Sequence, residues 1–276
     1  MSKNYKYGFI GAGNMGSAMI SGILEGGLAE KKDITFVTAS SRSAKNIEDR
    51  FGIEASKDAT SLASNSSVII LAVKPKQLDD VLPEIRESLD ADSIVISVAA
   101  GKSISDIDSA LLSIAVAGKL KVARAMPNTP AAVGEAMSAV CFNDRFEDTE
   151  KEEVLSVFRS FGKAEEVDEG LMDTVTGLSG SSPAFIYMLI EAMADEAVKC
   201  GMKREAAYTF AAQTVKGSAD MVLKTGKHPG ELKDQVTSPG GTTIAGVLAL
   251  EKNGFRSAVT EGIDAAVKRS MELSSD

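Results

Sequence analysis

Residues 5–16 have the sequence Tyr-Lys-Tyr-Gly-Phe-Ile-Gly-Ala-Gly-Asn-Met-Gly. The first half predicts a short apolar strand, and the second half has the spacing Gly-x-Gly-x-x-Gly, followed by small and apolar residues at helical spacing. In this strand–turn–helix context Gly11 makes the tight turn, Gly13 lets the backbone approach a pyrophosphate, and Gly16 packs the helix on the strand. The stretch therefore predicts a dinucleotide site at the start of an alternating α/β region. A glycine turn without a ligand is the alternative.

The residues after the second expected strand, Ile34–Thr38, decide which dinucleotide is favoured. An acidic residue there would bind the ribose 2′-hydroxyl of NAD, but the chain continues Ala39-Ser40-Ser41-Arg42-Ser43. The nearby carboxylate, Asp33, stands at the other end of the strand. Hydroxyl groups followed by an arginine suit a 2′-phosphate, so the pattern favours NADP. A solvated Arg42 that merely opens the next helix is the alternative.

Further strands are expected to end at the same edge of the sheet, at Val68–Val73, Ile94–Val98 and Lys121–Ala125. Ligands of open α/β sheets bind beyond the carboxyl ends of strands, which points to Lys74, the small residues Ala99–Gly101 and the loop Met126–Pro130. Lys74 can equally be an ordinary exposed lysine, and the loop can either line the site or merely turn the chain. The candidate cofactor-binding residues are Gly11, Ala12, Gly13, Asn14, Met15, Gly16, Ser40, Ser41, Arg42, Ala72, Val73, Lys74, Ala99 and Asn128.

The alternation of strands and helices stops after a short strand expected at Ala164–Val167. We therefore expect an α/β fold in which residues 1–168 form a Rossmann-type NADP-binding domain. Residues 169–276 are expected to form an all-helical domain for dimerisation and substrate binding. The helix Ala184–Ala194 is apolar on nearly all sides, and a helix without a polar face is buried. In a domain this small, we expect that burial to occur against a second subunit.

A second glycine-rich turn leads into a helix at residues 237–251, Thr-Ser-Pro-Gly-Gly-Thr-Thr-Ile-Ala-Gly-Val-Leu-Ala-Leu-Glu. Thr242 or Thr243 is the expected N-cap, because a hydroxyl there accepts from an unpaired N–H group of the first turn. The remaining N–H groups and the positive end of the helix dipole favour a bound anion, and Ser238 adds a further hydroxyl. An ordinary capped helix behind a tight turn is the alternative.

The composition excludes several classes of function. A formal net charge of −9 disfavours nucleic acid and anionic membranes as partners, since both need a basic surface. No apolar run approaches about 18 residues and no leader precedes the first strand, so neither membrane insertion nor export is expected. Cys141 and Cys200 have neither metal nor disulfide spacing, which favours a reducing, cytoplasmic compartment.

The sequence offers few side chains for acid–base chemistry. His228 is the single histidine and sits in a His-Pro-Gly turn, where we expect a structural role, general acid–base catalysis being the alternative. We find neither a Ser/His/Asp arrangement nor metal-ligand spacing, so no metal site is expected. The chemistry is therefore left to the nicotinamide of the cofactor.

Several segments carry a resemblance to a known family. They are Phe9–Gly16, Ala72–Pro75, Met126–Pro130, Thr176–Ala184 and His228–Gly241, and the most specific is Leu232–Ile244. Over essentially its whole length the chain resembles pyrroline-5-carboxylate reductases. The resemblance implies NADPH-dependent reduction of 1-pyrroline-5-carboxylate to L-proline, the last step of proline biosynthesis, with NADH as a possible second donor. It also implies a homodimer whose two chains complete each active site, with a decamer of five dimers as a larger assembly.

The same resemblance assigns roles to the second turn. It implies that the substrate-binding residues are Ser238, Gly240, Gly241, Thr242 and Thr243. They would hold the substrate's carboxylate and ring nitrogen, with the Thr243 hydroxyl on the nitrogen as the catalytic candidate. Asp58 stands where some relatives carry an asparagine near the adenosine ribose, and we assign it no role.

The reaction fits a site with little acid–base machinery. A protonated cyclic imine is already electrophilic, so hydride transfer from C4 of the nicotinamide needs positioning more than proton transfer. A β-hydroxyacid dehydrogenase with the same two-domain arrangement is one alternative, but such an enzyme would require a lysine in the interdomain helix. The chain has Ser179–Ser182 there and no lysine before Lys199. A regulator that binds NADP without turnover is the other alternative.

Overall fold

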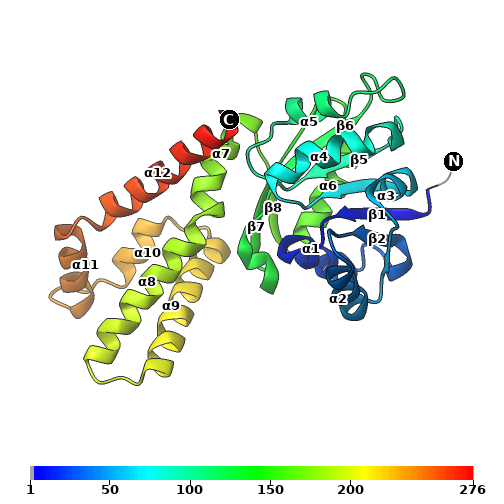
Figure 1. The fold of residues 1–276 in the computed structure, drawn as a ribbon. Helices are drawn as coiled ribbons and strands as arrows, with labels where there is room; N and C mark the ends of the chain where they lie inside the picture. Colours follow the sequence, from blue (N-terminus) through cyan, green and yellow to red (C-terminus); the bar gives the residue numbers. More distant parts are fainter. Residues whose placement is uncertain (1–2, 276) are drawn as a thin grey trace. The chain divides into compact units, whose positions relative to one another are not determined.

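The computed structural model describes residues 3–275. Contacts within the chain divide it into two compact units. The first, which we call the sheet unit, runs to Gly180 and is joined by the chain from Ala266 onward. The second, the helical unit, is Ser181–Ala265. Figure 1 labels the elements of both units.

The sheet unit is organised around one eight-stranded sheet of order β3-β2-β1-β4-β5-β6-β7-β8 (Figure 1). Its strands are β1 (Tyr5–Ile10), β2 (Ile34–Val37), β3 (Glu54–Ala55), β4 (Ser66–Leu71), β5 (Ile94–Ser97), β6 (Lys121–Met126), β7 (Ala136–Phe142) and β8 (Gly162–Glu166). Neighbouring strands are parallel except β6 and β7, which are antiparallel. The strand order reverses between β1 and β4, and such a switch point is where open α/β sheets bind ligands.

Helices and short turns connect the strands and follow the last of them, β8. The helices are α1 (Asn14–Glu25), α2 (Ser41–Phe51), α3 (Ala59–Asn65), α4 (Pro75–Ile85), α5 (Ile104–Ala110), α6 (Asp148–Arg159) and α7 (Met172–Val175). The 3-10 turns are η1 (Lys31–Asp33), η2 (Arg86–Ser88), η3 (Thr129–Val133) and η4 (Glu169–Leu171), and η5 (Thr176–Gly180) is π-helical. Side chains of Ser40, Asp58 and Ser103 accept N–H groups at the starts of α2, α3 and α5, as N-caps do.

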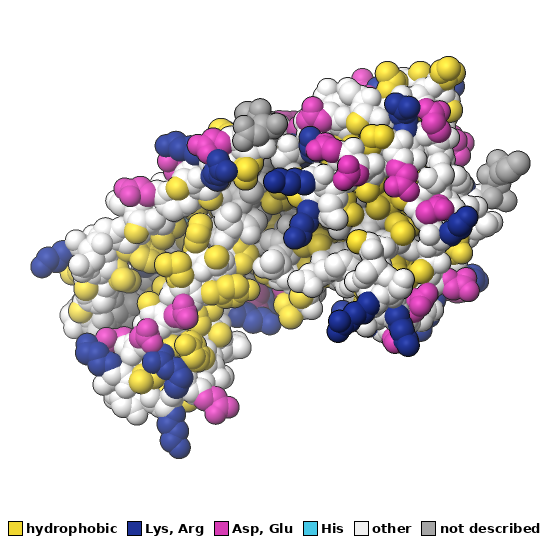
Figure 2. All heavy atoms as spheres, in the orientation of Figure 1, with side chains coloured by type: hydrophobic (Ala, Val, Ile, Leu, Met, Phe, Trp, Pro, Cys, Tyr) yellow, Lys and Arg dark blue, Asp and Glu magenta, His cyan; other side chains and the backbone are white. Residues whose placement is uncertain are grey.

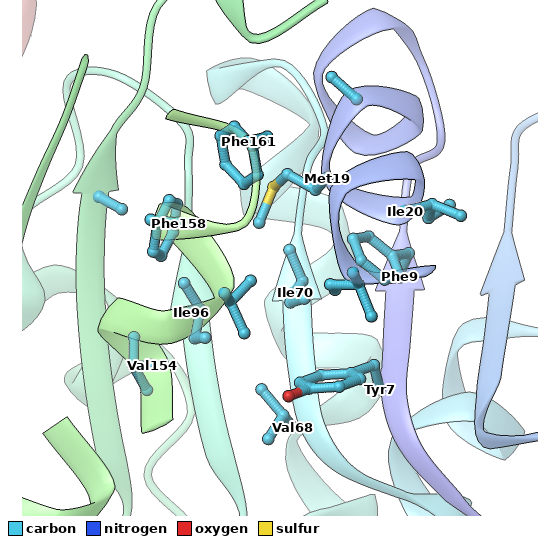
Figure 3. Close-up of a cluster of buried hydrophobic side chains, with 14 of the residues drawn as sticks. Tyr7, Phe9, Met19, Ile20, Val68, Ile70, Ile96, Val154, Phe158 and Phe161 are labelled. Atoms are coloured by element: carbon cyan, nitrogen blue, oxygen red, sulfur yellow. The ribbon is translucent and has the colours of Figure 1, made fainter. Parts of the chain in front are cut away.

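Apolar side chains fill both faces of the sheet. Successive residues of a strand point to opposite faces, so Ile70 belongs to one core and its neighbours Ile69 and Leu71 to the other. Figure 3 shows the first core, with the labelled side chains Tyr7, Phe9, Met19, Ile20, Val68, Ile70, Ile96, Val154, Phe158 and Phe161. Burial on both faces explains why β1, β4 and β5 read as almost continuous apolar runs.

The helical unit has a very small core of its own. It consists of α8 (Ser182–Lys199), α9 (Arg204–Thr225), α10 (Pro229–Gln235), α11 (Thr242–Lys252) and the first part of α12 (Phe255–Ser275). Among its described residues only Ala194, Ala207 and Ala211 are buried, while Met188 and Phe210 are 67% and 66% exposed. Figure 2 shows hydrophobic side chains over these helices. Exposed apolar surface of this kind is typical of sites that contact another protein, a membrane or a ligand.

The expected α/β fold with a helical second part is confirmed. β1 has the predicted bounds, whereas the strand expected at Val68–Val73 lies at Ser66–Leu71, because its apolar run continues into the loop that follows. The domain limits 1–168 and 169–276 stay a prediction, since the contacts divide the chain at Gly180. Among residues 3–275, no helix is both long and apolar enough to span a membrane.

Candidate active site

The parallel register brings the ends of the central strands to one edge of the sheet. Gly11 N–H donates to the Val37 carbonyl at 2.9 Å, and Ala72 N–H donates to the Ile10 carbonyl at 2.9 Å. Val98 N–H donates to the carbonyl at the end of β4 at 3.1 Å. The glycine turn, the segment after β4 and the segment after β5 therefore lie at the same carboxyl edge. The structure thus brings these three groups of predicted cofactor-binding residues to one region.

The three motif glycines differ in what surrounds them. Gly11 has a φ of 93°, in the left-handed region, and a Cβ there would lie 2.6 Å from the Ala72 carbonyl oxygen. A Cβ on Gly16 would lie 2.5 Å from the Gly11 carbonyl oxygen, so its absence allows α1 to pack on the turn. A Cβ on Gly13 would meet nothing within 4 Å. The open face at Gly13, directly before the first N–H groups of α1, fits a bound pyrophosphate.

Side chains of α1 hold the turn and border a cavity. The buried Ser17 hydroxyl donates to the Ala12 carbonyl at 3.0 Å, which fixes the loop from inside and was not predicted from the sequence. Asn14 is exposed and lines a cavity of about 440 Å³ together with Ala131–Gly134 at the end of η3. Met15 is half-buried. The loop after β6 therefore borders the first turn of α1.

The residues expected to recognise the 2′-phosphate form the first turn of α2. Ser40 is the N-cap, and its hydroxyl accepts from Ser43 N–H at 3.2 Å. Ser41 and Arg42 follow on the exposed surface, and this first turn contains no acidic residue. Among residues 3–275 the Arg42 guanidinium has no hydrogen-bond or ion-pair partner. A helix N-terminus with a free arginine is an arrangement that suits a phosphate.

Asp58 also acts at a helix start. Its carboxylate accepts from Ser61 N–H at 2.7 Å and caps α3. Hydrogen bonds from the side chain and backbone of Ser61 lower the pKa of the Asp58 carboxyl. Asparagine is an equally good N-cap, so either residue could begin α3 in this way.

The other predicted residues at this edge have varied surroundings. Ala72 and Val73 are half-buried beside the glycine turn, and Lys74 is exposed and precedes α4, which begins at Pro75. Ala99 is buried, and its N–H donates to the Ser97 hydroxyl at 3.3 Å. The Asn128 side chain bonds to two neighbouring segments of the sheet unit. The structure thus uses Asn128 as a structural bridge, whether or not it also contacts the cofactor.

The second turn differs from the sequence prediction at its cap. The N-cap of α11 is Gly241, not Thr242 or Thr243, and no side chain caps this helix. Gly241 N–H donates to the Ser238 carbonyl at 3.0 Å, and Gly240 has a φ of 70°, so the turn itself closes the chain onto the helix start. The prediction failed because it assigned the cap by residue type and ignored this backbone turn.

The corrected geometry changes what the hydroxyls can do. Thr242 and Thr243 occupy the first helical positions and are exposed, and Ser238 is exposed beside them. In the described part of the chain none of these three hydroxyls takes part in a hydrogen bond. The first turn of α11 also lacks an acidic residue. These groups are therefore available to a negatively charged ligand.

Few other described side chains are suited to catalysis. His228 is the N-cap of α10, and its Nδ1 accepts from Gly230 N–H at 3.0 Å, which confirms the expected structural role. Burial raises the pKa of the Cys141 thiol to about 12, so this cysteine is not a nucleophile near neutral pH. Within residues 3–275 no group of His, Cys, Asp and Glu side chains could hold a metal ion.

Comparisons with known proteins match both parts of the chain. A family model described as pyrroline-5-carboxylate reductase dimerisation matches residues 169–273. A second model, NADP oxidoreductase coenzyme F420-dependent, matches residues 6–101. The sequence predicted NADP as the cofactor. The second match confirms this prediction.

Relatives of known function match over nearly the whole length. Pyrroline-5-carboxylate reductase of Escherichia coli strain K12 is 46% identical, covering 98% of each chain. A solved structure of a pyrroline-5-carboxylate reductase from Coxiella burnetii has a TM-score of 0.89 and 32% identity, covering 99% of each chain. The Plasmodium falciparum pyrroline carboxylate reductase, solved with NADP bound, has a TM-score of 0.85 and 33% identity, covering 99% of this chain and 100% of its own. The chain belongs to the pyrroline-5-carboxylate reductase family.

Proposed function

We propose that the chain reduces 1-pyrroline-5-carboxylate to L-proline with NADPH as the hydride donor. The observation that carries this proposal is the 46% identity to the E. coli enzyme over 98% of both chains. The geometry supports it in two places. The open glycine turn fits a dinucleotide pyrophosphate, and the uncapped start of α11 fits a carboxylate.

The two places have different tasks in the proposed reaction. Bound NADPH supplies a hydride to the imine carbon, whose π electrons move onto the ring nitrogen. The N–H groups around Gly241 and Thr242 and the Ser238 hydroxyl bind the substrate carboxylate. The Thr243 hydroxyl hydrogen-bonds to the ring nitrogen and orients the imine. Orientation of this kind contributes most where the electrophile needs no further activation.

The direct test is to add 1-pyrroline-5-carboxylate to the purified protein with NADPH and to follow NADPH oxidation and proline formation. We expect equal amounts of proline and NADP. Oxidation of a β-hydroxy acid with NADP as the hydride acceptor, without reduction of the imine, would instead identify a dehydrogenase on the same plan. Tight NADPH binding without turnover of either substrate would identify a regulator.

We expect NADPH to be preferred over NADH, because Ser40, Ser41 and Arg42 stand where an NAD-binding carboxylate would be. In Arg42→Asp the KM for NADPH should rise roughly 10-fold relative to that for NADH. This is the low end for a charge-assisted contact, because the side chain is exposed. Lys45→Asp, an equal charge change further along α2, is the control. An unchanged ratio of the two KM values in Arg42→Asp would make Arg42 a solvated residue of the helix start.

Assembly is the other part of the proposal. The model for dimerisation matches residues 169–273, and the helical unit leaves large apolar side chains uncovered. We propose a homodimer in which both chains complete each active site, with the decamer as a larger assembly of five dimers. A helical dimerisation domain that begins at residue 169 and a cytoplasmic location belong to the same proposal. The free thiols of Cys141 and Cys200 support a reducing compartment.

A charge on the apolar face of α8 should dissociate the assembly. Met188 is 67% exposed in the single chain, so Met188→Glu places no charge inside the folded subunit. At a subunit interface the same charge would be buried without a partner. The variant should then be a monomer by light scattering. It should remain folded but have no activity. At the half-buried Leu189, a charge should also lower the stability of the subunit. Lys119→Glu in the sheet unit is the control, and a fully active monomer in any variant would contradict the shared site.

A further inference from the structure

Asn128 lies where three segments of the sheet unit meet. It follows β6, and its backbone carbonyl accepts from Ala131 N–H at 3.1 Å, which opens η3. The side-chain Oδ1 accepts from Met137 N–H of β7 at 3.0 Å, and Nδ2 donates to the Ser179 carbonyl of η5 at 3.0 Å. One side chain therefore connects the end of β6 to β7 and to the π-helical turn.

The bond to β7 takes the place of a backbone hydrogen bond between β6 and β7. In the antiparallel register of β6 and β7, Met126 pairs with Ala139. Continuing this register places Asn128 opposite Met137, but the Asn128 carbonyl is already used by η3. The side-chain oxygen takes over as acceptor, so the chain can leave β6 without orphaning a backbone N–H group of β7.

The bond to η5 has an equally specific cause. In a continuous α-helix the Ser179 carbonyl would accept from the N–H group of residue 183, but Pro183 has none. The next N–H group, that of Ala184, donates to the Ser181 carbonyl at 3.1 Å. The Asn128 amide supplies the donor that the helix cannot. π-Helical turns often occur at functional sites.

The anchored turn lies at the carboxyl edge of the sheet. A Cβ on Gly180 would lie 3.1 Å from Cε of Met126, so η5 packs against the last residue of β6. The neighbouring strand β5 leads to Ala99, Ala100 and Gly101, whose small side chains leave room for the nicotinamide ring. On the basis of the proposed function, we infer that Asn128 is a positioning residue for hydride transfer. Its amide holds η5 in place beside the nicotinamide, and this role needs no contact between Asn128 and the cofactor.

Asn128→Asp tests the role of the donor specifically. The substitution keeps the shape and the acceptor for Met137 N–H, but an ionised carboxylate has no donor for the Ser179 carbonyl. We expect kcat at alkaline pH to fall roughly 10- to 100-fold, because η5, a segment beside the reacting groups, would be displaced. The KM for NADPH should stay near that of the wild type. Protonation of the introduced carboxyl restores an O–H donor. The ratio of the variant kcat to the wild-type kcat should therefore rise as the pH falls.

Asn143 provides a matched control at the other end of the same strand pair. Its Nδ2 donates to the Leu120 carbonyl at 2.9 Å. Asn143→Asp makes the same chemical change in the same sheet, away from the carboxyl edge. It should lower the melting temperature but leave both kcat and its pH dependence at wild-type values. A purely structural role for Asn128 would make the two variants alike.

Hydrogen exchange tests the anchoring independently of activity. Amides of peptides covering residues 172–184 should exchange faster in Asn128→Asp than in the wild type at alkaline pH, and the difference should shrink at lower pH. Exchange unchanged from the wild type, or a folded variant with wild-type kcat, would overturn the inference. A raised KM for NADPH with unchanged kcat would overturn it too, because Asn128 would then be a cofactor ligand. A wild-type protein that does not reduce the imine refutes the proposed function instead, and the exchange result still decides whether Asn128 anchors η5.

Discussion

Replacing Gly13 by alanine is expected to raise the KM for NADPH on the order of 100-fold and to leave the fold intact. The added methyl group would meet no protein atom within 4 Å, and the φ of Gly13 is −68°, outside the left-handed region that favours glycine. The methyl group would instead occupy the space through which a pyrophosphate reaches the N–H groups of α1. A charge-assisted hydrogen bond lost there is worth about 1.5–3 kcal/mol, so the loss of one strong bond accounts for the effect.

Gly16→Ala is the matched control, because the same methyl group meets a different obstacle. At Gly16 it would lie 2.5 Å from the Gly11 carbonyl oxygen, so α1 must move away from the turn. Overpacking of this kind should lower the free energy of unfolding by up to about 3 kcal/mol. Gly13→Ala should lower it by only about 1 kcal/mol, the difference between glycine and alanine at an N-cap. Thermal unfolding and a fluorescence titration with NADPH measure both effects. Wild-type NADPH affinity in Gly13→Ala would show that the cofactor does not approach the backbone at this residue.

The contrast between the two glycines explains how much of the site the sequence could predict. The roles of Gly11, Gly13 and Gly16 follow from local geometry, since strand, turn and helix are adjacent in the chain. The bounds of β1 were predictable for the same reason. Features that depend on distant segments were not predictable. The bond from the Ser17 hydroxyl to the Ala12 carbonyl is local, but it was missed as well, because a serine in a helix has no distinctive pattern.

The role of Asn128 depends on the register of β6 with β7 and on a turn that begins about fifty residues later along the chain. Nothing near Asn128 in the sequence indicates either. One signal was present, because Pro183 removes the N–H group that the Ser179 carbonyl would have used. That signal shows that a donor is needed, but it does not show which residue provides it.

The cap of α11 was predicted wrongly for a related reason. Threonine and glycine are about equally suited to an N-cap, and here the left-handed backbone at Gly240 and the bond from Gly241 N–H to the Ser238 carbonyl place the N-cap at Gly241, one residue before Thr242. Preferences describe an average helix, whereas this turn is set by its own two glycines. The correction strengthens the functional interpretation, because hydroxyls that do not cap the helix are free to bind a ligand.

Thr243→Val is expected to cut turnover roughly 10- to 150-fold, because the lost hydroxyl orients the imine nitrogen in the proposed reaction. NADPH affinity should hardly change, since the candidate cofactor-binding residues are in the sheet unit. The free energy of unfolding should stay within about 0.5 kcal/mol of the wild type, because Thr243 caps nothing and valine has a similar helix propensity.

The control for Thr243→Val is Thr209→Val on α9, where the threonine hydroxyl donates to the Glu205 carbonyl within its own helix at 3.1 Å. Steady-state kinetics and thermal unfolding should be measured on both variants. Only Thr243→Val should lose turnover, and neither should lose much stability. A Thr243→Val protein with wild-type turnover would remove the hydroxyl from the reaction. The substrate would then be held by the N–H groups and by Ser238 alone. A large loss of stability with normal kinetics would contradict the uncapped start of α11 as well, because only a helix cap would produce that pattern.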